Sequence, residues 1–409
     1  MGGHVITNVR VFDGTGREPF AGEVLIDGNR ITAVGTTVER PRDAAVIDGR
    51  GGTLMPGLVE AHAHLSFPDL FTNEITRLPV EEHTLITVRN AKTMLDSGYT
   101  SAFSAASAKT RLDVVVKREI EAGRAPGPRM LANGPEITVT GGLGDTNQVH
   151  LPYDAEPNFC VIANGPDEIR RIARTFAREG VDLLKLNISG DGGTSSAGAD
   201  VTVMTDDEVA AAMEVARPRN LRVAGHCRSA GSVMMALRHG VEVIYHANYA
   251  DERALDALEA ARDRIFVAPA IGLTWSVAEY GQSVGVPEAR VKAQADELAL
   301  SADTYGRMRK RGIRVLPGGD YGFPTTPHGT YAKDLELFVD LLGFSPTETL
   351  IAATKYGGEI MGKPGELGVI AQGALADLII VDGDPLTHIA ILQDRAKLSM
   401  IMKDGRRHR

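Results

Sequence analysis

Residues 58–65 read Leu-Val-Glu-Ala-His-Ala-His-Leu, an apolar run of strand length that carries two histidines two positions apart. Seven further short apolar runs follow it, and segments with the periodicity of amphipathic helices separate many of them. Eight strands that alternate with helices predict an α/β fold, the (β/α)8 TIM barrel. The predicted barrel strands are residues 58–65, 100–104, 129–132, 181–188, 221–226, 241–246, 265–269 and 313–317.

The two ends of the chain have a different pattern. Short strand-like runs, punctuated by Gly, Asp and Asn, fill residues 1–57. The same pattern returns near the C-terminus, where Asp382-Gly383-Asp384-Pro385 predicts a turn. We therefore predict a small β-sandwich domain formed by residues 1–57 and 366–409, beside a barrel domain over residues 58–365.

The composition argues against several classes of function. The chain has 409 residues, with 44 Lys and Arg against 53 Asp and Glu, and no basic stripe that would favour nucleic acid or a membrane surface. Two cysteines, Cys160 and Cys227, are too few for a disulfide framework. No apolar run reaches about 18 residues, and no signal-peptide pattern is visible. We expect a cytoplasmic protein that acts on a small molecule and that can form a homo-oligomer.

Polar side chains stand at the ends of several predicted strands. His62 and His64, two apart on one strand, project to the same face, which suits two ligands on one metal ion. His226 and His246 end two successive strands, and Asp320 follows the eighth. Each of these three alone is compatible with a structural histidine or a loop aspartate. Because barrel strands end at one catalytic face, their joint placement predicts metal ligands, with Asp320 accepting a proton from the attacking water.

Lys185 lies in an otherwise apolar strand, residues 181–188. A buried unpaired ammonium group is costly, so this lysine must lose its charge, find a partner or react. One interpretation is a salt bridge to a nearby carboxylate. The other is a carbamate formed with carbon dioxide, which would turn a cation into a carboxylate-like group able to bridge two metal ions.

These residues and their order resemble the amidohydrolase superfamily over nearly the whole chain. Residues 54–58 before the histidine pair are similar to the family's entry into the barrel, and residues 368–378 to its return to the β domain. Within the superfamily, residues 137–142 and 343–362 resemble the imidazolonepropionase-like and Xaa-Pro dipeptidase-like branch, which includes ochratoxin-hydrolysing amidases. The chain departs from many relatives at Cys227-Arg228-Ser229, directly after His226.

The resemblance implies a binuclear centre. One divalent ion would be held by His62, His64, Lys185 and Asp320, and the other by Lys185, His226 and His246. Zinc is the expected metal, with manganese or cobalt as alternatives, and Lys185 would carry the carbamate. A hydroxide bridging the two ions would be the nucleophile.

The predicted reaction is hydrolysis of an amide C–N bond in an N-acyl amino acid, an X-Pro dipeptide or an ochratoxin-type amide. His150 is a candidate second donor to the scissile carbonyl. Arg228 could bind a substrate carboxylate or pair with an acidic neighbour. A urea, a carbamate or a cyclic amide would suit the same site. The rival hypotheses are a one-metal deaminase and a non-catalytic metal-binding relative.

Overall fold

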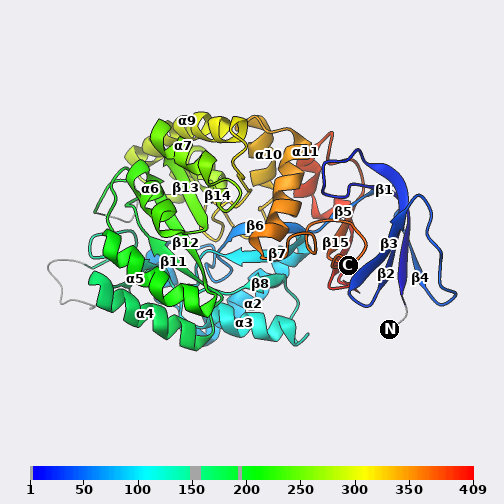
Figure 1. The fold of residues 1–409 in the computed structure, drawn as a ribbon, viewed down its shortest axis with the longest axis horizontal. Helices are drawn as coiled ribbons and strands as arrows, with labels where there is room; N and C mark the ends of the chain where they lie inside the picture. The colour runs from blue at the N-terminus through cyan, green and yellow to red at the C-terminus, as the bar shows by residue number, and fades with distance from the viewer. Residues whose placement is uncertain (1–2, 148–157, 192–195) are drawn as a thin grey trace.

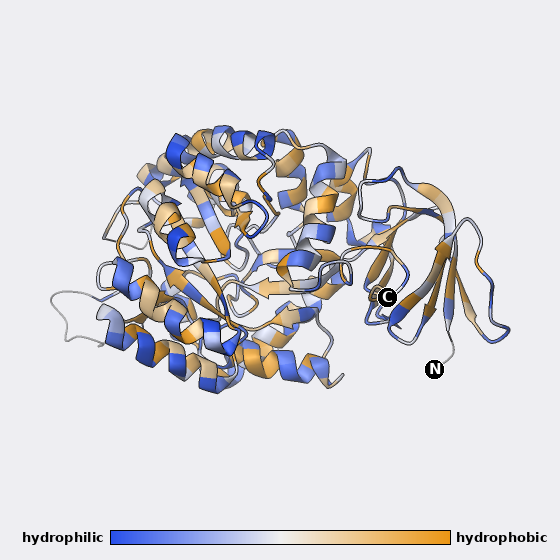
Figure 2. Ribbon diagram, viewed as in Figure 1, coloured by the Kyte–Doolittle hydropathy of each residue, from blue (hydrophilic) through white to orange (hydrophobic). Residues whose placement is uncertain are grey.

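The computed structural model describes residues 3–147, 158–191 and 196–409. Strands and helices alternate through most of the chain, and a separate β-rich part lies at one end of the molecule (Figure 1). Strands are largely apolar, whereas many helices are apolar along one side and polar along the other (Figure 2). Within the described ranges, no helix is long and apolar enough to cross a membrane.

The inner strands form two parallel sheets. Strands β6 (Leu58–Ala63), β7 (Tyr99–Ser104) and β8 (Arg129–Leu131) form the first sheet. The second has the order β10-β9-β11-β12-β13-β14. One backbone hydrogen bond, from Asp182 N to Ala132 O, connects the two sheets next to β8 and β11. The strands of the second sheet are β9 (Ile137–Thr138), β10 (Val161–Ile162), β11 (Leu183–Asn187), β12 (Arg222–Ser229), β13 (Val243–Tyr249) and β14 (Phe266–Ala268).

Seven of the eight predicted strands are present among the described residues. The prediction of the eighth strand is wrong. Residues 313–317 contribute only an isolated bridge, between Val315 and Val267. The backbone N–H of Leu316 donates to Val267 O at 2.8 Å, after which Pro317 and two glycines follow. Proline has no N–H to continue a ladder, and glycine weakens a strand, so the pairing stops early. The described strands therefore do not form one closed hydrogen-bonded barrel.

Helices cover the outside of the sheets, and their sequences explain why. In α4 (Gly165–Glu179), Ile169, Ile172 and Phe176 recur at helical spacing and are buried. The helix ends at Gly180, whose φ of 94° is in the left-handed region that glycine adopts without strain. The other helices of eight or more residues are α2 (Val80–Asp96), α3 (Leu112–Glu121), α5 (Asp206–Ala216), α6 (Ala230–His239), α7 (Glu252–Ala260), α8 (Ile271–Tyr280), α9 (Glu288–Lys310) and α10 (Lys333–Asp340).

Strands from the two ends of the chain pair in a third sheet. In this sheet β15 pairs with β5, with Ile379 opposite Met55. The strands have the order β17-β16-β15-β5-β1-β2-β3, and β4 pairs with β1. Hydrogen bonding thus gives a single eight-stranded sheet, and the finer prediction of a sandwich is not established. Its strands are β1 (His4–Val11), β2 (Phe20–Asp27), β3 (Arg30–Gly35), β4 (Ala45–Asp48), β5 (Thr53–Pro56), β15 (Leu378–Val381), β16 (Leu398–Lys403) and β17 (Arg406–Arg407).

Candidate metal centre

An open cavity lies at the carboxyl ends of the parallel strands. Parallel strands bring their carboxyl ends to one side, which is where α/β enzymes place their active sites. The cavity is lined by all six predicted metal ligands. They come from β6 and the residue just past its end, from β11, β12 and β13, and from the loop after residue 317: His62, His64, Lys185, His226, His246 and Asp320.

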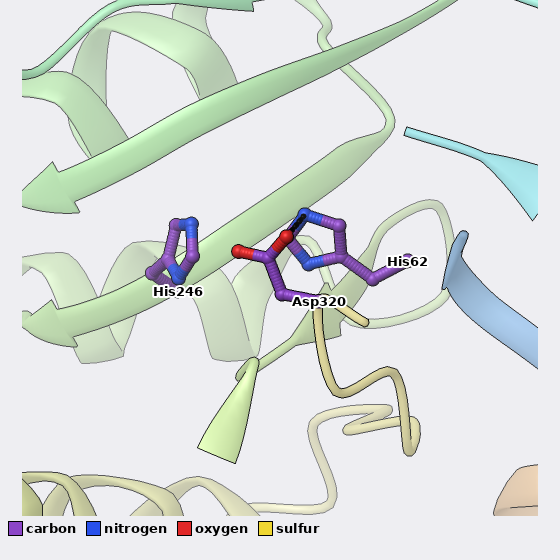
Figure 3. Close-up of side chains that lie close together, drawn as sticks. All are labelled: His62, His246 and Asp320. Atoms are coloured by element: carbon purple, nitrogen blue, oxygen red, sulfur yellow. Dashed lines mark ion pairs between the residues drawn. The ribbon is translucent and has the colours of Figure 1, made fainter. Parts of the chain in front are cut away.

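Three of these residues form the tightest group. His62, His246 and Asp320 each offer one ligand atom, and these atoms all lie within 4.8 Å of one another (Figure 3). His64 Nε2 lies 3.0 Å from Asp320 Oδ1, and the rings of His226 and His246 have centroids 4.4 Å apart. The structure therefore brings the five residues together. The tightest group combines members of both predicted ligand sets.

The chemistry of these histidines fits a divalent ion. His62 and His246 are 1% and 2% exposed, and the Nδ1 atom of each is buried with no hydrogen-bond partner within the described part of the chain. Burial, together with nearby cationic groups such as Lys185 and Arg228, lowers the pKa of both imidazoles well below the ordinary value. Burial also lowers the pKa of His226, to about 4. Neutral imidazole is the form that binds a metal ion.

The backbone at the site adopts an uncommon conformation. His246, Ala247 and Asp320 have φ values of 69°, 63° and 61°, in the left-handed region that costs a non-glycine residue free energy. The ladder between β12 and β13 is irregular at this point, between the Cys227–His246 and Ser229–Tyr249 pairs. Strain of this kind persists where surrounding structure enforces it and is concentrated at functional sites. Two of the three residues belong to the tightest ligand group.

Lys185 is 1% exposed and has two partners. Its Nζ lies 3.5 Å from Glu136 Oε1 and 4.2 Å from the centroid of the Tyr245 ring. Burial acts to raise the Glu136 pKa, but Lys185 and other cationic groups outweigh that effect and lower it. Glu136 also accepts a hydrogen bond from Asn187 Nδ2 at 2.8 Å. The structure therefore contains the ion pair that was one of the two alternatives for Lys185.

Arg228 is also paired. Its Nε lies 2.9 Å from Asp191 Oδ2, and its Nη1 contacts a carboxylate oxygen of Glu297. Arg228 is 5% exposed, so this ion-pair network is largely withdrawn from water. Of the two interpretations of Arg228, pairing with an acidic neighbour is the one that the structure contains. His150 lies outside the described residues.

The acidic partners of Lys185 and Arg228, which are Glu136, Asp191 and Glu297, were not predicted from the sequence. Glu136 directly precedes the short strand β9, and an acid beside an apolar strand was the one available signal. Asp191 follows β11 in a glycine-containing loop and resembles an ordinary surface loop residue. Glu297 lies 69 positions from its partner Arg228 on a mostly polar helix, so no local pattern identifies it.

Apolar side chains line the rest of the cavity. Phe67 stacks on His64 with a centroid distance of 4.1 Å and an angle of 11° between the rings. Phe159 and Phe323 lie against Phe67, at 5.0 and 5.4 Å between ring centroids. The aliphatic lining includes Leu273, Val277 and Val286, from α8 and the segment that follows it. The cavity thus places apolar side chains beside its ionisable groups, which suits a ligand with an apolar part and a polar part.

Comparisons with known proteins agree on one family. A model of the amidohydrolase family matches residues 53–407. An ochratoxinase from Aspergillus niger is 26% identical over 411 residues, which cover 95% of this chain and 83% of that protein. An imidazolonepropionase from Rubrobacter xylanophilus is 23% identical over 409 residues, covering 93% of this chain and 89% of that protein. A solved prolidase complexed with N-methylphosphonate-L-proline gives a TM-score of 0.90 at 25% identity, with 99% of each chain covered.

Proposed function

Since this chain belongs to the amidohydrolase family and is a hydrolase, we propose that it is a two-metal enzyme that cleaves the amide C–N bond of a small molecule. The family resemblance in the sequence motifs is confirmed by the match over residues 53–407. We further propose that the two parallel sheets belong to a (β/α)8 barrel. The observation that carries the proposal is the convergence of His62, His246 and Asp320 within 4.8 Å in a buried cavity.

The ligand sets of the proposal are those that the family resemblance implies. His62, His64 and Asp320 would hold one ion, His226 and His246 the other, and Lys185 would reach both as a carbamate. Starting from the ammonium group, the lysine would lose one proton to become an amine. Its nitrogen would then bond to the carbon of carbon dioxide and lose a second proton as the carbamate forms. The carbamate would replace the Lys185–Glu136 ion pair. Glu136 would then keep its hydrogen bond from Asn187 but lose its cationic partner.

When bound, divalent ions lower the pKa of a coordinated water toward neutrality and polarise the scissile carbonyl. The chain itself supplies the proton transfer. Burial acts to raise the Asp320 pKa, but the hydrogen bond and charge of His64 lower it overall, so the carboxylate is ionised near neutral pH. Asp320 would accept a proton from the attacking water and donate it to the leaving nitrogen as the C–N bond breaks. His150 remains a predicted donor to the substrate carbonyl.

The proposed substrates are N-acyl amino acids, X-Pro dipeptides and ochratoxin-type amides. The similarity to an ochratoxinase and to a prolidase supports this range. The apolar lining, with Phe67, Phe159 and Phe323 close to His64, supports a substrate with a bulky apolar group next to the amide.

A metal-dependent hydrolase screen tests the proposal. The protein would be stripped with a chelator, reloaded with zinc, manganese or cobalt, and assayed on the proposed amides, on phenylureas and on carbamates. We expect chelation to abolish amide hydrolysis and metal to restore it. Ammonia release from an amino-substituted ring, with one ion per chain, would favour the one-metal deaminase instead. No turnover of any substrate by fully metal-loaded protein would favour the non-catalytic relative.

A further inference from the structure

The ionic groups that line the cavity are mostly paired with one another. Lys185 contacts Glu136, and the Asp320 carboxylate contacts His64. Arg228 contacts Asp191 and Glu297. The arginine is thus matched by two acids, and a third carboxylate brought to it would be repelled by both. A buried pair is also costly to break.

Arg290 is different. It lies in the first turn of α9 and is exposed, and it lines the same cavity as the candidate ligands. Among the described residues, its side chain makes no ion pair or hydrogen bond, in contrast to Lys185 and Arg228. An arginine guanidinium keeps its charge at all ordinary pH values and can hold a carboxylate through two parallel hydrogen bonds.

Apolar side chains line the same cavity as Arg290. Val286 lies four positions before it, and Val277 and Leu273 of α8 line the cavity as well. The aromatic residues Phe67 and Phe159 also line it, with Phe67 stacked on His64. The cavity therefore combines the candidate metal centre, apolar walls and one cationic side chain that lacks an acidic partner in the described structure.

We propose that Arg290, and not Arg228, is the residue that binds the carboxylate of the substrate. The substrate class is an amide whose scissile bond is flanked by an aromatic or large aliphatic group and whose other end carries a carboxylate. Arg228 is a positioning residue in this assignment, since it pairs with both Asp191, at the cavity wall, and Glu297 behind it. The substrate class rests on the proposed amide hydrolysis, whereas carboxylate binding at Arg290 does not.

Matched substrates isolate the carboxylate. N-acyl-phenylalanine and N-acyl-phenethylamine differ only in that group, so both would be assayed with the metal-loaded enzyme. Arg290→Met should raise KM for N-acyl-phenylalanine roughly tenfold, the scale of one charge-assisted hydrogen-bonding contact, with kcat retained. N-acyl-phenethylamine should be unaffected, and Arg290→Lys should recover part of the loss. Lys292→Met is the control, because Lys292 is on the same helix, pairs with Asp296 and does not line the cavity.

Binding gives a readout that is independent of turnover. Calorimetry would compare 3-phenylpropanoate with 3-phenylpropanamide on the same metal-loaded variants. We expect the carboxylate to bind more tightly than the amide to the parent protein and to Lys292→Met, and that preference to disappear in Arg290→Met. An unchanged preference in Arg290→Met would overturn the proposal, because the carboxylate would then be bound elsewhere, for example on a metal ion. An Arg290-dependent preference in a protein that hydrolyses no amide would support the binding site and refute the proposed reaction.

Discussion

The sheet built from the chain ends and the cavity at the strand ends both contain fully buried side chains, but these side chains differ in chemistry. Ile6, Val24, Leu54, Ile380 and Met400 of the terminal sheet are 0–1% exposed, and its strands are predominantly apolar in Figure 2. At the cavity, three of the most buried side chains are ionisable. They are the imidazoles of His62 and His246 and the amino group of Lys185, and these residues are 1–2% exposed.

This difference separates two uses of burial. Removing apolar surface from water stabilises the fold, by roughly 25 cal/mol for each Å² buried. Burying ionisable groups costs free energy unless they are paired, and the left-handed backbone at His246 and Asp320 adds strain. We infer that the terminal sheet contributes chiefly stability, whereas the cavity sacrifices stability for function. Substitutions in the two regions should therefore affect different measurements.

The largest effect is expected at Lys185. Lys185→Ala should lose at least one metal ion per chain and most activity, because the proposed carbamate bridges both ions. Lys185→Arg should lose metal and activity as well, since a guanidinium stays charged and cannot form a carbamate. Short carboxylic acids in the medium should restore part of the metal content and part of the activity of Lys185→Ala, because they can occupy the space left by the proposed carbamate. Elemental analysis and rate measurements on the same samples check this. A Lys185→Ala protein with full metal content and activity would contradict it.

Substitution of Asp320 should affect proton transfer much more than metal binding. Asp320→Asn should keep much of the metal, since four histidines remain, yet lose roughly 10²- to 10⁴-fold in kcat, the usual contribution of a positioned general base. The measurement is kcat at matched metal content. A loss of less than tenfold would remove Asp320 from the proton transfer.

The terminal sheet should respond in the opposite way. Ile380→Ala, in the aliphatic core of β15, should lower the free energy of unfolding by about 2–5 kcal/mol and leave kcat unchanged. Val46→Ala on β4 is the matched control, because Val46 is 59% exposed and its truncation should cost no more than about 0.5 kcal/mol. Denaturant unfolding and steady-state rates test both. A marked fall in the kcat of Ile380→Ala would mean that the sheet and the cavity are coupled.

A smaller effect is expected at His328, beside the cavity. Its ring nitrogens lie 2.6 Å from Phe67 O and 2.6 Å from the Tyr331 hydroxyl, and burial lowers its pKa to about 4. The unfolded chain takes up the proton near pH 6.5, so the folded state loses stability as the pH falls from about 6.5 to 4, by at most about 3 kcal/mol. His328→Gln should flatten this part of the stability–pH curve. The comparison requires equal metal content, and parallel curves for the two proteins would contradict the assignment.

The sequence predicted which polar residues line the cavity better than it predicted their partners, for physical reasons. The two-residue period of a strand places His62 and His64 on one face, and parallel topology brings the other strand ends to the same cavity. The partners of the buried charges could not be predicted, because only tertiary folding brings Glu297 to Arg228 across 69 positions. The eighth strand was overestimated, because its apolar run resembled the others while Pro317 and the following glycines limited its pairing.

We infer that the buried polar cluster holds two catalytic metal ions. The most direct test is the number of divalent ions per chain, measured by elemental analysis in the same samples in which amide hydrolysis is assayed during chelation and stepwise reloading with zinc. We expect no activity in the stripped protein and full activity at two ions per chain. Full activity in a protein shown to be free of metal would contradict it.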